Sequence, residues 1–316
     1  MIITASRRTD IPAYFSEWFM NRINEKYCTV QNPYYPEQVS FIDLTPEAVE
    51  SFVFVTKNAA PMIKHIQQLN DEGYKYYFHY TVNNLPNNYE RNIPSFENGT
   101  NTFIKLVDKI GKGKVIWRYD PIIFTNDLTL QFHKQNFEKI YNKIGDYTKR
   151  LVISVVDNYA KTIKRLNKLN VNYNQEQLKN PELDELIYFI KEKASLKNIE
   201  IVSCAEPILK DYSIKEGKCI DDDLMREELG VITNYKKSKS QRDTCSCVES
   251  RDIGFNNTCL MGCEYCYATL THETAVKNKS RHNPLHSSIV EHKIPEKIVQ
   301  KINEHKNKSV QLSLNI

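Results

Sequence analysis

The chain has 316 residues, of which 41% are hydrophobic and 26% charged, and 43 basic residues nearly balance 39 acidic ones to give a formal net charge of +4. This composition excludes a disordered chain, and so mild a charge does not by itself identify a nucleic-acid binder. Apolar runs stay short of the ~18 residues of a membrane span, and the first residues lack the segments of a signal peptide. We therefore expect a cytoplasmic protein without a membrane partner.

Short β-branched and aromatic runs alternate with longer helical patterns over the first two thirds of the chain, which is typical of βα units and a parallel sheet. Six such units predict an α/β fold, a TIM-like β/α barrel that is partial unless two strands have escaped the pattern. The predicted strands are Ile2–Ser6, Phe52–Thr56, Lys75–Val82, Lys114–Tyr119, Leu151–Val156 and Ile199–Cys204, and the predicted helices are Ala13–Asn24, Pro61–Asp71, Thr102–Ile110, Leu130–Ile144, Asn158–Leu169 and Pro181–Ala194.

Two parts of the chain depart from this alternation. Residues 27–44 place Asn32, Pro33 and Pro36 between two extended runs, which predicts a hairpin insertion. From about Lys210 the alternation stops, polar residues become frequent and cysteines appear. We therefore divide the chain into a barrel, residues 1–209, and a cysteine-rich segment, residues 210–316. A basic run near residues 236–242 within that segment is either solvated linker or a phosphate-contacting patch.

Polar residues stand at or just after each predicted strand. Taken singly each has a structural explanation: Asp10 and Asp157 as N-caps, Arg118 and Asp120 as a local pair. Together they predict a polar cavity at the carboxyl ends of the strands, with enough cations for an anionic group on the substrate or cofactor. The residues in question are Arg7, Arg8, Thr9, Asp10, Lys57, Asn58, Asn83, Asn84, Arg118, Asp120, Asp157, Cys204 and Glu206.

Five of the eight cysteines lie between positions 245 and 266, and such crowding in a reducing compartment indicates metal ligation. Cys259, Cys263 and Cys266 have the spacing C-x3-C-x2-C, with Tyr265 before the last cysteine. Three thiolates this close together can hold three irons of a cubane cluster and leave the fourth iron free to chelate a small molecule. The alternative is a zinc knuckle, which requires a fourth cysteine or histidine ligand.

This motif resembles the signature of radical S-adenosylmethionine enzymes. The resemblance implies a [4Fe-4S] cluster whose open iron binds S-adenosylmethionine, and a reductant such as flavodoxin or ferredoxin. Members of that superfamily carry the motif near the N-terminus, whereas here it lies within the last sixth of the chain. A segment 210–316 that folds back over the barrel mouth, or a circular permutation, would reconcile the two positions.

Nearly the whole chain resembles a bacterial family catalogued as domain of unknown function 1848, which has a C-terminal cysteine cluster like the N-terminal one of radical S-adenosylmethionine proteins. The stretch 262–267 is also similar to the cluster loop of spore photoproduct lyases. The segments that carry the family resemblance are Ile3–Pro12, Val55–Asn58, Trp117–Pro121, Ser203–Glu206, Lys218–Asp221, Cys245 with Cys247, Asp252–Gly254 and Cys259–Tyr267.

The remaining cysteines leave two possibilities open. Cys204, Cys219, Cys245 and Cys247 could ligate a second iron–sulfur cluster or a zinc ion. Alternatively, Cys245 and Cys247 belong to the first site and Cys204 is simply packed. Cys28, in the predicted hairpin, is expected to be a structural thiol.

Two functions follow from these observations. The first is an enzyme of the radical S-adenosylmethionine type that acts on a small-molecule or nucleic-acid substrate in the cavity. The second is a nucleic-acid-binding protein in which zinc or a cluster has only a structural role in the cysteine-rich segment, without radical chemistry. For the enzyme, we expect catalysis by Lys57, Arg118, Asp120 and Glu206, cofactor binding by Arg7, Arg8 and Tyr265, and one or two clusters on the seven cysteines outside the hairpin.

Overall fold

The computed structural model describes residues 1–169, 171, 173 and 176–314. Its centre is a sheet of eight parallel strands in the order β10-β1-β4-β5-β6-β7-β8-β9. All six predicted strands are present, and two short ones join the ends of the row. The bounds are β1 Ile2–Ala5, β4 Ser51–Thr56, β5 Tyr76–Thr81, β6 Val115–Ile122, β7 Arg150–Val155, β8 Glu200–Ser203, β9 Lys215–Glu216 and β10 Arg251–Asp252.

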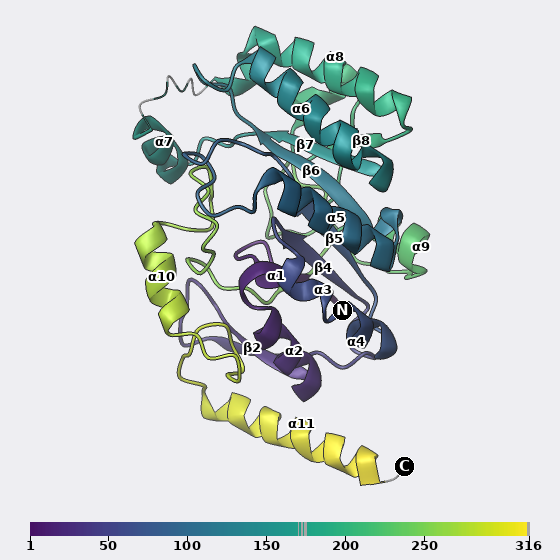
Figure 1. The fold of residues 1–316 in the computed structure, drawn as a ribbon. Coiled ribbons are helices and arrows are strands. Elements are labelled where there is room, and N and C mark those ends of the chain that lie inside the picture. The colour runs from purple at the N-terminus through teal and green to yellow at the C-terminus, as the bar shows by residue number, and fades with distance from the viewer. Residues whose placement is uncertain (170, 172, 174–175, 315–316) are drawn as a thin grey trace.

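The helices follow the strands as βα units require, and α5, α6 and α8 lie along one side of the sheet in Figure 1. Two of the predicted helices are each split into two pieces, the first at Phe15 and the second at Lys64–His65. The bounds are α1 Ile11–Tyr14, α2 Ser16–Glu25, α3 Ala60–Ile63, α4 Ile66–Asp71, α5 Phe96–Ile110, α6 Leu130–Ile144, α7 Ala160–Asn167, α8 Pro181–Leu196, α9 Asp222–Leu229, α10 His272–Ser280 and α11 Glu296–Leu314, with short 3₁₀ turns at Lys112–Lys114, Gly145–Tyr147, Gln177–Lys179 and Pro207–Tyr212.

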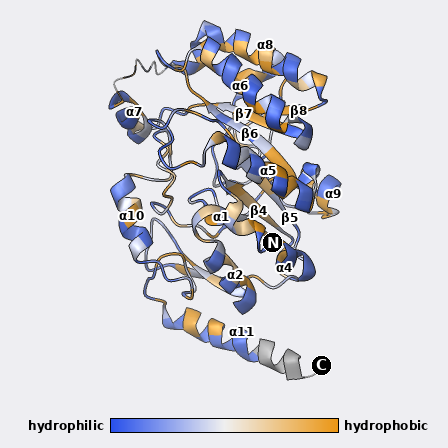
Figure 2. Cartoon of the chain, in the orientation of Figure 1, coloured by the Kyte–Doolittle hydropathy of each residue, from blue (hydrophilic) through white to orange (hydrophobic). Residues whose placement is uncertain are grey.

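Each face of the sheet has its own apolar core, because successive side chains of a strand point to opposite faces. Phe52, Phe54 and Trp117 belong to the larger core, which includes residues of the covering helices. The neighbouring residues on the same strands form a smaller core on the other face, together with Ile220, Cys247 and Val248 from the cysteine-rich segment: Ile2, Val53, Tyr77, Ile116, Val152 and Val202. Figure 2 shows orange, apolar stretches along the strands and blue, hydrophilic stretches along the covering helices α5, α6 and α8. Burial on both faces explains why these strands are near-continuous apolar runs.

The architecture is therefore α/β with a parallel sheet, as predicted, but a closed barrel is not shown. The row of strands ends at β10 on one side and at β9 on the other, and no pairing between these two strands is found among the described residues. Both end strands have two residues and come from the cysteine-rich segment. The sequence pattern of βα units stops before them, which is why they were not predicted.

The antiparallel pair β2 (Tyr27–Gln31) and β3 (Val39–Asp43) stands outside the main sheet. Helix α11 packs on it through Ile298 and Ile302, which contact a small cluster around Tyr27. In Figure 1 this helix is the yellow one at the C-terminal end, apart from the helices that cover the sheet. Within the described part of the chain, no helix combines the length and apolar character that a bilayer crossing requires.

Candidate functional site

A cavity of about 340 Å³ opens at the carboxyl ends of the strands. Its wall combines the residues that follow the strands with two stretches of the cysteine-rich segment. The structure thus brings together, in one cavity, thirteen of the residues predicted from the sequence: Arg7, Arg8, Lys57, Arg118, Asp120, Tyr265, Cys204, Cys219, Cys245, Cys247, Cys259, Cys263 and Cys266. Thr9, Asp10 and Asp157, also predicted at the cavity, line it as well. Four predicted residues do not line it: Asn58, Asn83, Asn84 and Glu206, the last of which is buried just beyond the lining residue Ala205.

The loop Cys259–Cys266 is fastened by its main chain to the segment that follows β5. Asn92 N donates to Met261 O at 2.9 Å, Glu264 N donates to Tyr89 O at 3.0 Å, and Glu90 and Cys263 form an antiparallel bridge. Gly262 allows this approach, because its φ is +67° and a Cβ there would lie 2.9 Å from Arg91 Cβ. The three cysteines are therefore held over the cavity by backbone contacts that do not depend on a metal.

Helix α7 holds the same loop from the other side through one side chain. The guanidinium of Arg165 donates to the carbonyl oxygens of Glu264 (2.7 Å), Thr269 (2.9 Å), Leu270 (3.1 Å) and Cys266. A planar group with five donors suits such a turn of carbonyls.

Lys57, predicted as catalytic, and Tyr265, predicted to bind a cofactor, meet on a carboxylate that the sequence did not reveal. Lys57 Nζ lies 2.8 Å from Glu90 Oε1, and the Tyr265 hydroxyl donates to the same oxygen. Asn83 Nδ2 donates to the Tyr265 hydroxyl at 3.2 Å. Glu90 is only 2% exposed, so this pair of charges is buried directly beneath Cys263. This buried ion pair therefore positions the loop that carries Cys263.

Arg118 and Asp120 form the local pair considered above, and the pair extends further. Arg118 Nε donates to Asp120 Oδ2 at 2.8 Å, and the Ser154 hydroxyl donates to the other carboxylate oxygen. Arg118 Nη1 lies 3.1 Å from Cys219 Sγ. The guanidinium therefore links the strand-end carboxylate to a thiol of the cysteine-rich segment.

Arg7 and Arg8 meet Asp252 of β10. Arg8 Nε is 3.1 Å from Asp252 Oδ1, and its Nη2 donates to the carbonyl of the same residue at 2.8 Å. The Arg7 amide donates to Asp252 Oδ2 at 2.9 Å, whereas its guanidinium Nε stays 4.0 Å from that oxygen. Arg7 is thus the less engaged of the two cations at the cavity.

Cys204, Cys219, Cys245 and Cys247 lie near one another and can bind metal. Cys204 Sγ is 3.6 Å from Cys219 Sγ, and Cys247 makes side-chain contacts with both Cys219 and Cys245. All eight cysteines of the chain are free thiols. The sequence left open whether Cys245 and Cys247 belong with the motif cysteines, and the structure groups them with Cys204 and Cys219.

The thiols of the two sets differ in their acidity. Burial raises the pKa of the Cys259 and Cys263 thiols, so without a metal these two are protonated. The shared hydrogen bond with Cys204 and the nearby Arg118 lower the pKa of Cys219. The contact with Cys247 lowers the pKa of Cys245 to about 6. In the four-cysteine set, hydrogen bonds between the thiols raise the pKa of Cys204 and Cys247 and lower that of Cys219 and Cys245. Two of the four thiols thus favour the thiolate, the form that binds metals.

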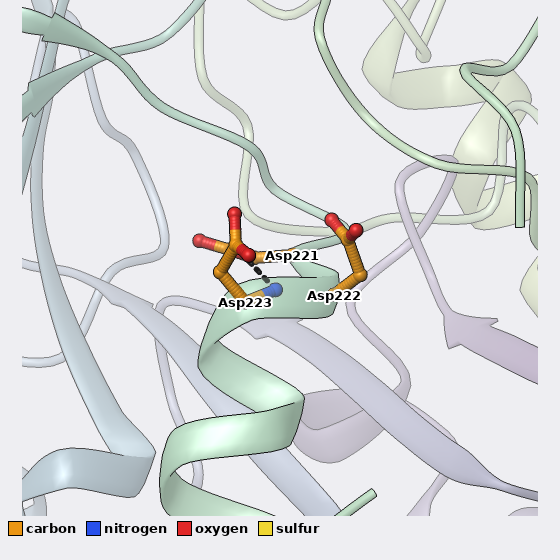
Figure 3. Close-up of side chains that lie close together, drawn as sticks. All are labelled: Asp221, Asp222 and Asp223. Atoms are coloured by element: carbon orange, nitrogen blue, oxygen red, sulfur yellow. Dashed lines mark hydrogen bonds between the residues drawn. The ribbon is translucent and has the colours of Figure 1, made fainter. Parts of the chain in front are cut away.

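Asp221, Asp222 and Asp223 also come together, with one carboxylate oxygen from each within 4.8 Å of the others (Figure 3). Asp221 caps α9 by accepting from the amides of Asp223 and Leu224, and it pairs with Arg150 Nη1 at 2.7 Å. The other two carboxylates bind Lys218 Nζ at 2.7 and 3.0 Å. Helix capping and these cations account for the acidic cluster.

Two residues of the site, Glu90 and Arg165, were not predicted from the sequence, and a third, Asp10, has a larger role than a helix cap. Glu90 and Arg165 act through contacts to the cysteine loop that are remote in sequence, and no local motif marks them. Asp10 was predicted at the cavity, with a helix cap as the alternative explanation. It does cap α1, but its carboxylate also accepts from the Thr56 hydroxyl (2.7 Å) and the Lys57 amide (2.8 Å) at the cavity wall.

A search of curated protein sequences found no match. Among solved structures, the chain is similar to a provisionally assigned phosphomethylpyrimidine kinase from Bacteroides thetaiotaomicron, with 13% sequence identity and a TM-score of 0.25. That alignment covers 65% of this chain and 62% of the other, so less than two thirds of the other chain is spanned.

One family covers the strands, the cavity and both cysteine sets described above. Residues 2–268 match the sequence model of the family described as domain of unknown function DUF1848. The matched range begins at β1 and ends two residues after Cys266. The chain therefore belongs to the DUF1848 family.

Proposed function

We propose that this chain is an iron–sulfur enzyme of the radical S-adenosylmethionine type, with its substrate in the cavity at the carboxyl ends of the strands. One observation carries the proposal. Cys259, Cys263 and Cys266 line the same cavity as Lys57, Arg118 and Asp120, although these residues come from distant parts of the chain. A volume of about 340 Å³ falls in the range of small-molecule sites.

The donor set fits a [4Fe-4S] cluster with one open iron. Three partly buried thiols come from one loop, and each lines the cavity. Cys259, Cys263 and Cys266 would hold the cluster, which with S-adenosylmethionine at its open iron would supply one-electron reductive cleavage of that cofactor and hydrogen-atom abstraction from the substrate. The cavity must hold the substrate close to the 5′ carbon of the cofactor, which would take the hydrogen atom, and it must keep water out.

The chain's own residues meet these two demands. Arg118, fixed by Asp120, supplies a positioned cation at the cavity wall for an anionic part of the substrate. Arg7, whose guanidinium is only loosely engaged, is suited to the carboxylate of S-adenosylmethionine. Apolar side chains of Val155, Val156 and Met261 cover other parts of the wall, which limits the access of water.

A reductant would reach the cysteine loop from the opposite side. A second hollow, of about 450 Å³, is lined by Cys259, Cys263 and Cys266 and by a row of basic residues. Four of these, Lys161, Lys164, Arg165 and Lys168, have the spacing of a single helical face. We propose that an acidic one-electron carrier of the flavodoxin or ferredoxin class docks here, because opposite charges steer such encounters.

The test is anaerobic reconstitution with iron and sulfide. The electron paramagnetic resonance signal of the reduced cluster should change when S-adenosylmethionine is added, and dithionite should then drive formation of 5′-deoxyadenosine. Cys263→Ala should abolish both responses, and Cys28→Ala, which removes a buried thiol elsewhere, should retain them. An unchanged signal at saturating S-adenosylmethionine, with no 5′-deoxyadenosine formed, would rule the proposal out.

A further inference from the structure

The four-cysteine set gathers stretches of chain from both ends of the row of strands. Cys204 follows β8 and Cys219 follows β9, at one end of the row of strands. Cys245 and Cys247 precede β10, at the other end, where β10 pairs with β1. We infer that these four cysteines form a tetrahedral site for a single metal ion of the zinc type, which joins the two ends of the sheet.

One pair of sulfurs has the spacing of two ligands on a single ion. Zinc binds thiolate sulfur at about 2.3 Å, so two ligands of a tetrahedral ion lie about 3.8 Å apart. Cys204 Sγ and Cys219 Sγ are 3.6 Å apart. In a cubane, by contrast, each cysteine binds a different iron, and the sulfurs lie farther apart. In the loop 259–266 the contact is between main chains, from Cys266 N to Cys263 O at 3.1 Å.

Donors already point at the sulfurs, as they do around metal-bound thiolates. The amides of Cys219 and Ile220 lie 3.2 and 3.4 Å from Cys247 Sγ. Arg118 Nη1 lies 3.1 Å from Cys219 Sγ. Four thiolates around a divalent ion carry two negative charges, and the guanidinium, which also pairs with Asp120, lies next to them. These contacts stabilise the charged form of the ligand set.

The protein fixes the Cys219 turn independently of a metal. The Tyr77 hydroxyl donates to the Cys219 carbonyl at 2.7 Å, and His79 Nε2 lies 2.8 Å from the same oxygen. Val248 N donates to Ile220 O at 3.2 Å, which brings the stretch before β10 onto this turn. Both stretches also share the smaller core with the strands. The ion would therefore tie together two stretches that are already in place.

The experiment uses the full-length chain with Cys259, Cys263 and Cys266 all changed to alanine, so that the other set cannot contribute metal. We expect one zinc per chain. Replacement of zinc by Co²⁺ should give the absorption of a tetrahedral tetrathiolate. Adding Cys204→Ser or Cys245→Ser should weaken Co²⁺ binding at least 100-fold, whereas adding Cys28→Ala should leave it unchanged. Hydrogen exchange of β10 and β9 amides should accelerate in the metal-free protein.

Two results would overturn the inference: about four irons with inorganic sulfide in this background, or Co²⁺ affinity that is the same with and without Cys204 and Cys245. Cys204 directly follows β8 of the central sheet, whereas Cys245 lies in the loop before β10, so the Cys245 serine variant is the one to rely on if Cys204→Ser does not fold. Because the motif cysteines are absent, neither result depends on the proposed radical chemistry.

Discussion

Two cysteine-bearing regions face one cavity, and different parts of the chain hold them there. The loop 259–266 is fixed by main-chain contacts to residues 89–92 and by Arg165, with its thiols aimed into the cavity. In the four-cysteine set the thiols contact one another and receive hydrogen bonds. Thiols spread along a loop suit a cluster with a free iron, whereas thiols in pairwise contact, from Cys204 through Cys219 and Cys247 to Cys245, suit one ion. The number of cysteines in the chain does not reveal this difference in arrangement.

The largest expected effect separates the two regions completely. Cys263→Ala should remove about four irons per chain while the metal at the four-cysteine set and the circular dichroism spectrum stay unchanged, because the sheet has its own core. Iron, sulfide and zinc analysis on the same sample measures this. Loss of both metals together, or retention of full iron, would contradict the assignment of ligands.

Arg165→Met should loosen the cluster loop without touching a thiol. Hydrogen bonds to a charged donor each contribute roughly 1.5–3 kcal/mol, so we expect the loop to lose about 3 kcal/mol, or roughly 100-fold in its opening equilibrium. Iron transfer to a chelator should accelerate accordingly. Lys164→Met, on the same helix, is the matched control. Equal rates for both variants would mean that the carbonyl contacts do not hold the loop.

Both regions depend on the sheet and its covering helices, and acid should weaken that common frame. Burial lowers the pKa of His133 to about 4, so this histidine is neutral in the folded protein and takes up a proton on unfolding below about pH 6.5. The contribution of neutral His133 to the free energy of unfolding is therefore fully present above pH 6.5 and is lost as the pH falls toward 4. Between pH 7 and 4.5, His133→Gln should lose about 2 kcal/mol less than the unaltered protein. Urea unfolding at both pH values measures the difference, and identical losses would refute it.

The smallest effect concerns the basic hollow behind the cluster loop. Lys164→Glu with Lys168→Glu should slow cluster reduction by reduced flavodoxin about tenfold at low salt, with reduction by dithionite unchanged. Lys109→Glu with Lys112→Glu, exposed lysines near the end of α5, is the control. An effect on the dithionite rate, or none on the flavodoxin rate, would argue against docking there, and salt-sensitive nucleic-acid binding lost with the same pair would favour the other partner class.

The sequence predicted the six longer strands because their residues are apolar on both faces, and α6 has the predicted bounds Leu130–Ile144. It could not predict β9 and β10, whose residues Lys215–Glu216 and Arg251–Asp252 are charged and pair only through tertiary contacts. The grouping of Cys204, Cys219, Cys245 and Cys247 was one of two alternatives that the sequence left open, and the structure brings these four together. Glu90 could not be predicted, since its function depends on Tyr265, which lies 175 residues away.

The pairing of β10 with β1 also bears on how the chain folds during synthesis. Thr4 and Ser250, which share a hydrogen bond beside this pairing, are separated by 246 residues. At 5–20 residues per second, roughly 10–50 s pass between the translation of the two. Throughout that interval the outer edge of β1 has unpaired amides and carbonyls, which can recruit another strand. The nascent chain is thus expected to need a chaperone, and self-association should be greatest in chains that stop before residue 250.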